Sequence, residues 1–218
     1  MIRVVGLGAG GHAKVVIEIL RASSDVEVVG LLDIREALWG TAVVGVPVLG
    51  GDRLLPELRA QGIEHVFIGV GSRGDMEPRR RLYMHAQSLG LRAVSAVHPS
   101  ATISRSATIG HGVTIMPEVI VNAEARLGDN VILNSGAIVE HDCVIGDHVH
   151  IATGARLAGS VAVGEGTHVG AGACVRDSCR IGRDVIVGAG TVVVKDVPNN
   201  VVVVGSPARL LRHRAREP

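Results

Sequence analysis

The sequence predicts a small α/β domain followed by an all-β solenoid. Three observations support this fold class: strand-like and helix-like segments alternate before residue 97, an aliphatic residue then recurs at every sixth position, and only 1% of the chain is aromatic although 47% is hydrophobic. A core built without aromatic rings must be narrow, because Val, Ile, Leu and Ala fill little space. We therefore predict domains at residues 1–96 and 97–197 and a C-terminal segment at 198–218.

The α/β domain is predicted to hold a short, Rossmann-like parallel sheet. Hydrophobic runs indicate strands at residues 3–6, 26–32 and 66–70, and helical periodicity indicates helices at 12–22, 52–60 and 76–89. Because the two kinds of segment alternate, consecutive strands are expected to run parallel.

A glycine-rich loop follows the first predicted strand. Gly6, Gly8 and Gly11 form a GxGxxG pattern, and Asp33 stands at the end of the second strand. Glycines let backbone amides approach a phosphate at the start of a helix. The pattern fits a dinucleotide site, but fewer than 100 residues amount to only half of a full dinucleotide fold, which favours a mononucleotide or a nucleotide-sugar. A glycine turn that only packs the strand on the helix is the third alternative.

The six-residue series runs without a gap from Val97 to Val193. Two positions before each of its members lies a second series of small residues, which includes Ala101 and Cys143. A helix cannot keep a six-residue pattern on one face, and a long flat strand needs no turn residue in every repeat. The residue that often follows the aliphatic one is Gly or Asn, both of which tolerate left-handed backbone angles.

These repeats resemble the hexapeptide-repeat acyltransferases, in which each repeat forms one side of a triangular, left-handed parallel β-helix. Three hexapeptides then make one coil, so residues 18 positions apart should stack at about 4.8 Å. Together, GAGGHAK at residues 8–14, VEHDC at 139–143 and GSPAR at 205–209 make the whole chain similar to the NeuD/PglD-type sugar O/N-acyltransferases of that superfamily.

The resemblance implies a cytoplasmic, homotrimeric enzyme that uses acetyl-CoA to N-acetylate a UDP-, GDP- or TDP-linked 4-amino-4,6-dideoxysugar. Coenzyme A would lie in the groove between adjacent β-helices. Two alternatives stay open: O-acetylation of sialic acid or another sugar, as in NeuD-like members, and a non-catalytic protein that binds a nucleotide-sugar or a dinucleotide.

The resemblance also assigns residues to the reaction. His141 would be the general base, with Asp142 holding its imidazole, and a histidine suits that task near neutral pH. The residues implied to contact acetyl-CoA are His150 near the thioester, Gly159 at its carbonyl, and Gly170, Ala171, Gly188 and Ala189 along the pantetheine arm. Those implied to bind the nucleotide-sugar are Gly10, Gly11, His12, Asp33, Ile34 and Gly71. Relatives can carry two acidic residues where this chain has Asp33 followed by Ile34.

The repeat register supplies expectations of its own. Ala123 and Gly159 lie 18 positions either side of His141, so small neighbours should leave its imidazole in a notch. Cys143 belongs to the inward series. We expect the three histidines His111, His148 and His168 to be solvated surface residues, and we expect no metal site.

Composition excludes several classes of partner. A net charge of +1 gives no general attraction to nucleic acid, and the longest valine run, Val201 to Val204, is too short to span a membrane. Three cysteines without a CxxC pair favour a reducing cytoplasm, and the first residues carry no signal-peptide pattern.

Overall fold

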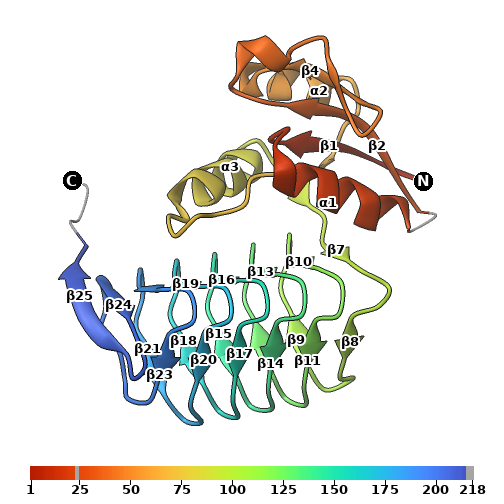
Figure 1. Cartoon of the computed structure of the whole chain (residues 1–218). Helices are drawn as coiled ribbons and strands as arrows, with labels where there is room; N and C mark the ends of the chain where they lie inside the picture. Colours follow the sequence, from red (N-terminus) through yellow and green to blue (C-terminus); the bar gives the residue numbers. More distant parts are fainter. Residues whose placement is uncertain (23–24, 215–218) are drawn as a thin grey trace.

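The computed structural model describes residues 1–22 and 25–214, so the last four residues of the predicted C-terminal segment lie outside it. Figure 1 shows an α/β domain placed over one side of a long prism of stacked coils. The prism is a left-handed parallel β-helix, as the repeats predict.

The α/β domain is a parallel sheet flanked by helices. Its sheet has the order β3-β4-β2-β1-β5-β6, in which only the β3–β4 pair is antiparallel. The strands are β1 (Ile2–Leu7), β2 (Val26–Leu32), β3 (Ala42–Val43), β4 (Val46–Gly50), β5 (His65–Ile68) and β6 (Arg92–Ala93). The helices are α1 (Gly11–Arg21), α2 (Leu55–Ala60) and α3 (Glu77–Ser88), with short 3-10 turns η1 (Glu36–Leu38) and η2 (Asp52–Leu54).

The predicted strands and helices of this domain are present, with ends displaced by up to three residues. Sequence reasoning missed β3, β4 and β6. β4 alternates buried and exposed residues over only five positions and contains Pro47, which makes its pattern short and weak. The missed β4 matters because the loop after it lines the same pocket as the glycine loop.

The β-helix has three faces, and each coil contributes one two-residue strand to each face. Face 1 contains β7 (Ala96–Val97), β10 (Thr114–Ile115), β13 (Ile132–Leu133), β16 (His150–Ile151), β19 (His168–Val169) and β22 (Ile186–Val187). Face 2 contains β8 (Thr102–Ile103), β11 (Ile120–Val121), β14 (Ile138–Val139), β17 (Arg156–Leu157), β20 (Cys174–Val175) and β23 (Val192–Val193). Face 3 contains β9 (Thr108–Ile109), β12 (Arg126–Leu127), β15 (Val144–Ile145), β18 (Ala162–Val163) and β21 (Arg180–Ile181).

The strands pair parallel with a register of 18 residues, as in Ile132 with His150 and His150 with His168. From Ala101 onward both predicted inward series line one continuous core, in which Cys143 is fully buried, whereas Val97 at the start of the prism is 41% exposed. The three aromatic residues Trp39, Phe67 and Tyr83 all lie in the α/β domain. A narrow aliphatic interior therefore explains the unusual composition.

After Pro198 the hexapeptide pattern ends, but the C-terminal segment continues the sheet of face 1. β24 (Val201–Val204) pairs parallel with β22 on face 1, and β25 (Arg209–His213) pairs antiparallel with β24. The arginines Arg209, Arg212 and Arg214 lie in or directly after β25. This pair of strands covers the last coil of the prism, which would otherwise present an open sheet edge.

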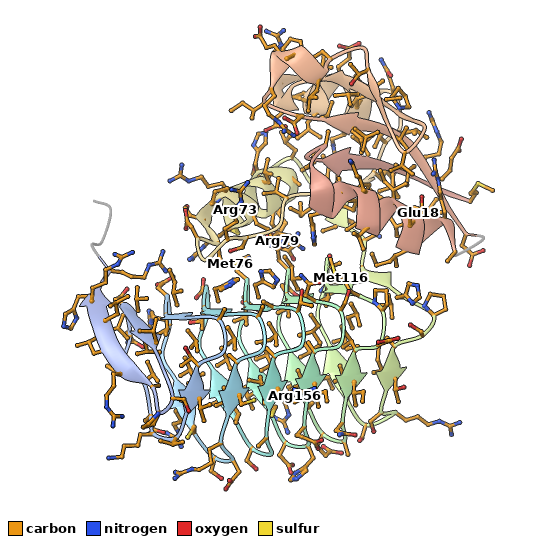
Figure 2. All side chains as sticks on the ribbon, in the orientation of Figure 1. Glu18, Arg73, Met76, Arg79, Met116 and Arg156 are labelled. Atoms are coloured by element: carbon orange, nitrogen blue, oxygen red, sulfur yellow. The ribbon has the colours of Figure 1, made fainter. Side chains whose placement is uncertain are left out.

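One fully buried arginine joins the two domains. Arg79 on α3 points down onto face 1, as Figure 2 shows, and none of its surface is exposed. Its guanidinium donates to the carbonyls of Ile68 at 2.7 Å and Val70 at 2.9 Å in the α/β domain. It also donates to the carbonyls of Asn130 and Gly112 in the β-helix, at 3.3 and 3.4 Å. Burial lowers the pKa of Arg79 to about 9, so it remains charged at neutral pH.

Candidate functional site

The carboxyl ends of β1, β2, β4 and β5 enclose a pocket of about 770 Å³. In a parallel sheet these ends meet at one edge, where ligands usually bind. The pocket is lined by all six residues predicted to bind the nucleotide-sugar, namely Gly10, Gly11, His12, Asp33, Ile34 and Gly71. Ile34 is 86% exposed and presents an apolar wall at the mouth.

Gly8 allows the chain to turn tightly at the base of this pocket. Its φ is +109°, and a Cβ there would lie 2.6 Å from Val70. The loop that follows places Gly10 and Gly11 at the start of α1, where backbone N–H groups point into the pocket without intrahelical partners. A phosphate is the ligand that such a helix start favours.

The Asp33 carboxylate is occupied by bonds within the protein. Its oxygens accept hydrogen bonds from the backbone N–H of Ala9 at 2.7 Å and of Arg35 at 2.9 Å, and from the Arg35 guanidinium at 2.8 and 2.9 Å. These bonds hold the pKa of Asp33 at about 2. Asp33 therefore fastens the glycine loop to the loop after β2, and little of its hydrogen-bonding capacity faces the pocket.

His12 stands between the pocket and Arg79. Its Nε2 lies 3.4 Å from Nη1 of Arg79, and burial together with that positive charge lowers the pKa of His12 to about 3. The imidazole is therefore neutral at physiological pH. A cation beside Nε2 disfavours a proton on that atom, which leaves the proton on Nδ1 near Gly71.

Several pocket residues were not predicted from the sequence. They are Asp52 after β4, Ser72 and Arg73 after β5, Arg35 after β2, and Pro78, Arg81 and Leu82 on α3. Most follow the end of a parallel strand, and this signal would have located Asp52 had β4 been recognised. Arg35 is paired with Asp33 and Arg81 with Glu77, so Arg73 is the arginine of this group whose positive charge suits a diphosphate.

A second candidate site is the edge between faces 2 and 3, where His141 and Asp142 form a pair. Nδ1 of His141 lies 2.7 Å from Oδ2 of Asp142, and the two side chains are 58% and 57% exposed. The hydrogen bond that Nδ1–H of His141 donates to the Asp142 carboxylate raises the pKa of His141. Asp142 has a φ of 59°, a left-handed conformation that aspartate tolerates and that turns its side chain back onto the histidine.

The predicted notch around His141 is present. A Cβ added to Gly159 would lie 2.6 Å from Cε1 and 2.7 Å from Nε2 of the imidazole, so the ring rests directly on the Gly159 backbone. The Gly159 carbonyl accepts from Ser178, but among the described residues its N–H donates to no backbone carbonyl. An unused donor thus lies beside the histidine.

Replacing Gly159 by alanine is expected to displace the His141 ring while leaving the coil intact. The added methyl group meets a mobile, exposed side chain, so the ring rather than the backbone should move. Because small displacements of a catalytic group cost about 100-fold in rate, kcat should fall by roughly 10- to 100-fold with the melting temperature nearly unchanged. Steady-state kinetics and thermal unfolding of Gly159→Ala measure both, and an unaltered kcat would contradict this reading of the notch.

The histidines of face 1 are more buried than the sequence suggested. His148 is only 5% exposed and lies 2.9 Å from the Asn130 amide, with its ring edge-on to Tyr83. The expectation of a solvated His148 was therefore wrong, because α3 covers it. His168 is half-buried, whereas His111 is 86% exposed as expected.

His150 is also 5% exposed and stacks edge-on against His168 at 4.7 Å. Burial and the neighbouring His168, His12 and Arg79 hold its pKa well below the usual value. Neither of its ring nitrogens has a hydrogen-bond partner among the described residues. Its implied contact with the thioester remains a prediction.

The structure places the predicted acetyl-CoA residues on different edges of the prism. Gly170, Ala171, Gly188 and Ala189 lie on the edge between faces 1 and 2, where Gly170 stacks against Gly188. His141 and Gly159 lie on the edge between faces 2 and 3. Face 2 separates the two groups, so one chain does not bring them together.

Two further features bear on the classes of function considered. The part of the chain that the structure describes contains no group of three or more His, Cys, Asp or Glu residues placed to hold a metal ion. Within residues 1–22 and 25–214, no helix combines the length and the apolar character that crossing a bilayer requires.

Family models match three parts of the chain. The PglD N-terminal domain matches residues 3–86, the GMPPB C-terminal domain matches residues 92–176, and the bacterial transferase hexapeptide repeat matches residues 160–195. Among curated proteins, UDP-N-acetylbacillosamine N-acetyltransferase of Bacillus subtilis (strain 168) is 38% identical over 120 residues, a match that spans about half of each protein, 50% of this chain and 49% of the relative.

Solved structures match over nearly the full length. A histidine-to-asparagine mutant of perosamine N-acetyltransferase from Caulobacter crescentus, in complex with CoA and GDP-perosamine, is 44% identical with a TM-score of 0.89, and the match covers 96% of each chain. The acetyltransferase domain of PglB from Neisseria gonorrhoeae FA1090 is 36% identical with a TM-score of 0.88, covering 97% of this chain and 100% of that one. The fold, the hexapeptide repeats and the identity over the full length together show that the chain belongs to the PglD/NeuD-type sugar acyltransferases of the hexapeptide-repeat superfamily.

Proposed function

We propose that the protein is an acetyl-CoA-dependent N-acetyltransferase that acts on a nucleotide-linked 4-amino-4,6-dideoxysugar. One observation carries the proposal: the same chain combines a phosphate-favouring pocket with an exposed His141–Asp142 pair resting on Gly159. The relatives support it, since one was solved with both CoA and GDP-perosamine and another with acetyl coenzyme A. We place the reaction in the cytoplasm, where both kinds of substrate are available.

The geometry suits direct transfer between two bound substrates. Asp142 accepts a hydrogen bond from Nδ1–H of His141, which keeps the proton on Nδ1 and leaves Nε2 with a free lone pair. As the sugar amine attacks the thioester carbonyl, Nε2 takes a proton from the nitrogen, and the Gly159 N–H is placed to donate to the developing oxyanion. The C–S bond then breaks, and the proton on Nε2 neutralises the coenzyme A thiolate. Cys143 takes no part because its sulfur is buried and donates to the Ala158 carbonyl.

The pH profile of kcat/KM should report the protonation of His141. A base must be neutral to accept a proton, so activity should fall as pH drops through the pKa of His141, which Asp142 raises. Replacing Asp142 by asparagine keeps a residue that tolerates the left-handed turn but removes the charge. The acidic limb of the profile should then move to lower pH and the maximal rate should fall. A limb that stays in place in Asp142→Asn would contradict the assignment of that limb to His141.

We further propose that the active enzyme is a homotrimer with sites between chains. The α/β domain lies over face 1, whereas His141 lies on the edge between faces 2 and 3, which is opposite face 1 in a triangular prism. The partner subunit's His141 must therefore act as the base for a sugar that is bound in one chain's pocket. Light scattering should find three chains per particle, and a fully active monomer would overturn this arrangement.

A thermal-shift screen tests the nature of the nucleotide site. Ligands that bind only the folded state raise the melting temperature with occupancy. We expect stabilisation by at least one of GDP, UDP and TDP and by acetyl-CoA, with little effect of CMP-sialic acid. Stabilisation by NAD alone would contradict the proposed function and support a dinucleotide-binding protein.

A further inference from the structure

The order of the strands places Asp52 at one end of the pocket and Gly71, Ser72 and Arg73 at the other. Moving along the edge of the sheet, the loop after β4 carries Asp52, the loop after β2 carries Asp33, and the glycine loop follows β1. Adjacent strands are about 4.8 Å apart, so the end of β4 lies about 10 Å from the glycine loop. A nucleotide whose diphosphate lies at the start of α1 would place its base toward Asp52.

Asp52 is the carboxylate that remains for a ligand. Asp33 is occupied by Ala9 and Arg35, whereas among the described residues no donor contacts the Asp52 carboxylate. Asp52 is also half-buried, and burial raises its pKa because the charged form loses solvent. A ligand that donates hydrogen bonds would compensate this cost.

The protein itself holds Asp52 in position. The Asp33 N–H donates to the Gly50 carbonyl at 2.9 Å, and Nε1 of Trp39 donates to the Asp33 carbonyl at 2.8 Å. The Trp39 ring packs on Gly51, where a Cβ would lie 3.2 Å from it. These contacts join the loops after β2 and β4. The position of Asp52 in the pocket is therefore fixed before a ligand binds.

Nucleobases differ in what they offer to a carboxylate. The Watson–Crick edge of guanine carries two adjacent donors, N1–H and the 2-amino group, which match the two oxygens of a carboxylate. Uracil and thymine offer a single donor, N3–H. The carbonyl oxygens on either side of it repel a carboxylate. Adenine offers one donor beside an acceptor.

We propose that Asp52 selects a guanine nucleotide by accepting hydrogen bonds from N1–H and the 2-amino group of the base. The inference rests on the proposed function, because it names the nucleotide of that same substrate. Family membership does not settle the base, since one relative was solved with GDP-perosamine and the name of another contains UDP. Ile34 would supply an apolar surface for the face of the base.

Calorimetric titration of the full-length protein tests this proposal with GDP, inosine diphosphate, UDP and TDP. Inosine lacks only the 2-amino group, so it isolates one of the two hydrogen bonds. The wild type should bind GDP roughly 10-fold more tightly than inosine diphosphate and roughly 100-fold more tightly than UDP or TDP. Asp52→Ala should lower the affinity for GDP roughly 100-fold and abolish the preference for GDP over inosine diphosphate.

Asp25→Ala is the matched control for Asp52→Ala. Both substitutions remove one carboxylate from the α/β domain, but Asp25 precedes β2, at the opposite end of the sheet from the pocket. The control should retain wild-type affinities. Preference of the wild type for UDP or TDP, or an unchanged GDP preference in Asp52→Ala, would overturn the inference while leaving the proposed function standing. Failure of every nucleotide to bind would overturn both.

Discussion

Replacement of His141 by alanine is expected to lower kcat/KM for acetyl transfer by about 10²- to 10⁴-fold, the usual contribution of a general base. The imidazole rests directly on Gly159, and its partner Asp142 cannot take over its place in the notch. Binding should survive, because the pocket lies on the other domain. Initial rates with acetyl-CoA and calorimetry with the nucleotide measure the two effects separately.

His111→Ala is the matched control for this variant. His111 also lies on an edge of the β-helix, 86% exposed and 3.4 Å from a carboxylate, that of Asp129. Its removal should leave kcat/KM unchanged. Equal losses in the two variants, or full activity in His141→Ala, would show that the reaction does not depend on this base.

Replacement of Arg79 by alanine is expected to cause the largest loss of stability. Truncation would leave four buried carbonyls, those of Ile68, Val70, Gly112 and Asn130, without their donor. An unsatisfied buried polar group costs about 1–3 kcal/mol, and solvent entering the gap would satisfy some of these groups, so we expect a total of about 3 kcal/mol or more. For a chain of this size that corresponds to a fall in Tm of roughly 10 °C at constant protein concentration.

The neighbouring Arg80 provides the control. It also joins α3 to the β-helix, through an ion pair with Glu165 at 2.7 Å, but it is 39% exposed. Exposed pairs contribute at most about 1 kcal/mol, so Arg80→Ala should change Tm little. Arg79→Lys keeps the charge and some of the donors, so its melting temperature should lie between those of Arg79→Ala and Arg80→Ala. Equal melting temperatures for the two alanine variants would contradict the role assigned to Arg79.

The β-helix was predictable from the sequence because every coil is stabilised by burying side chains at the same positions of the repeat. Each coil buries the same two positions, so a single pattern from Val97 to Val193 specifies every strand, and the stacking of His150 on His168 follows by counting 18 residues. The notch at Gly159 follows from the same arithmetic. The resemblance also indicated six of the residues that line the pocket.

Contacts between the domains were not predictable in this way. Whether His148 is solvated depends on where α3 rests, and no periodicity encodes that position. Asp33 fits a nucleotide fingerprint in the sequence, but only the coordinates show that Arg35 and Ala9 occupy its oxygens. Asp52 was missed because β4 is too short to give a clear strand signal.

The proposed reaction is tested most directly by mass spectrometry of the product formed from acetyl-CoA and a GDP-linked 4-amino-4,6-dideoxysugar. The matched substrate carries a hydroxyl group in place of the 4-amino group. We predict one N-acetylated nucleotide-sugar per molecule of coenzyme A released, with transfer slowed about 10²- to 10⁴-fold in His141→Ala and absent with the 4-hydroxyl substrate. Acetylation of the hydroxyl substrate at an equal rate, or release of coenzyme A without an acetylated sugar, would contradict it.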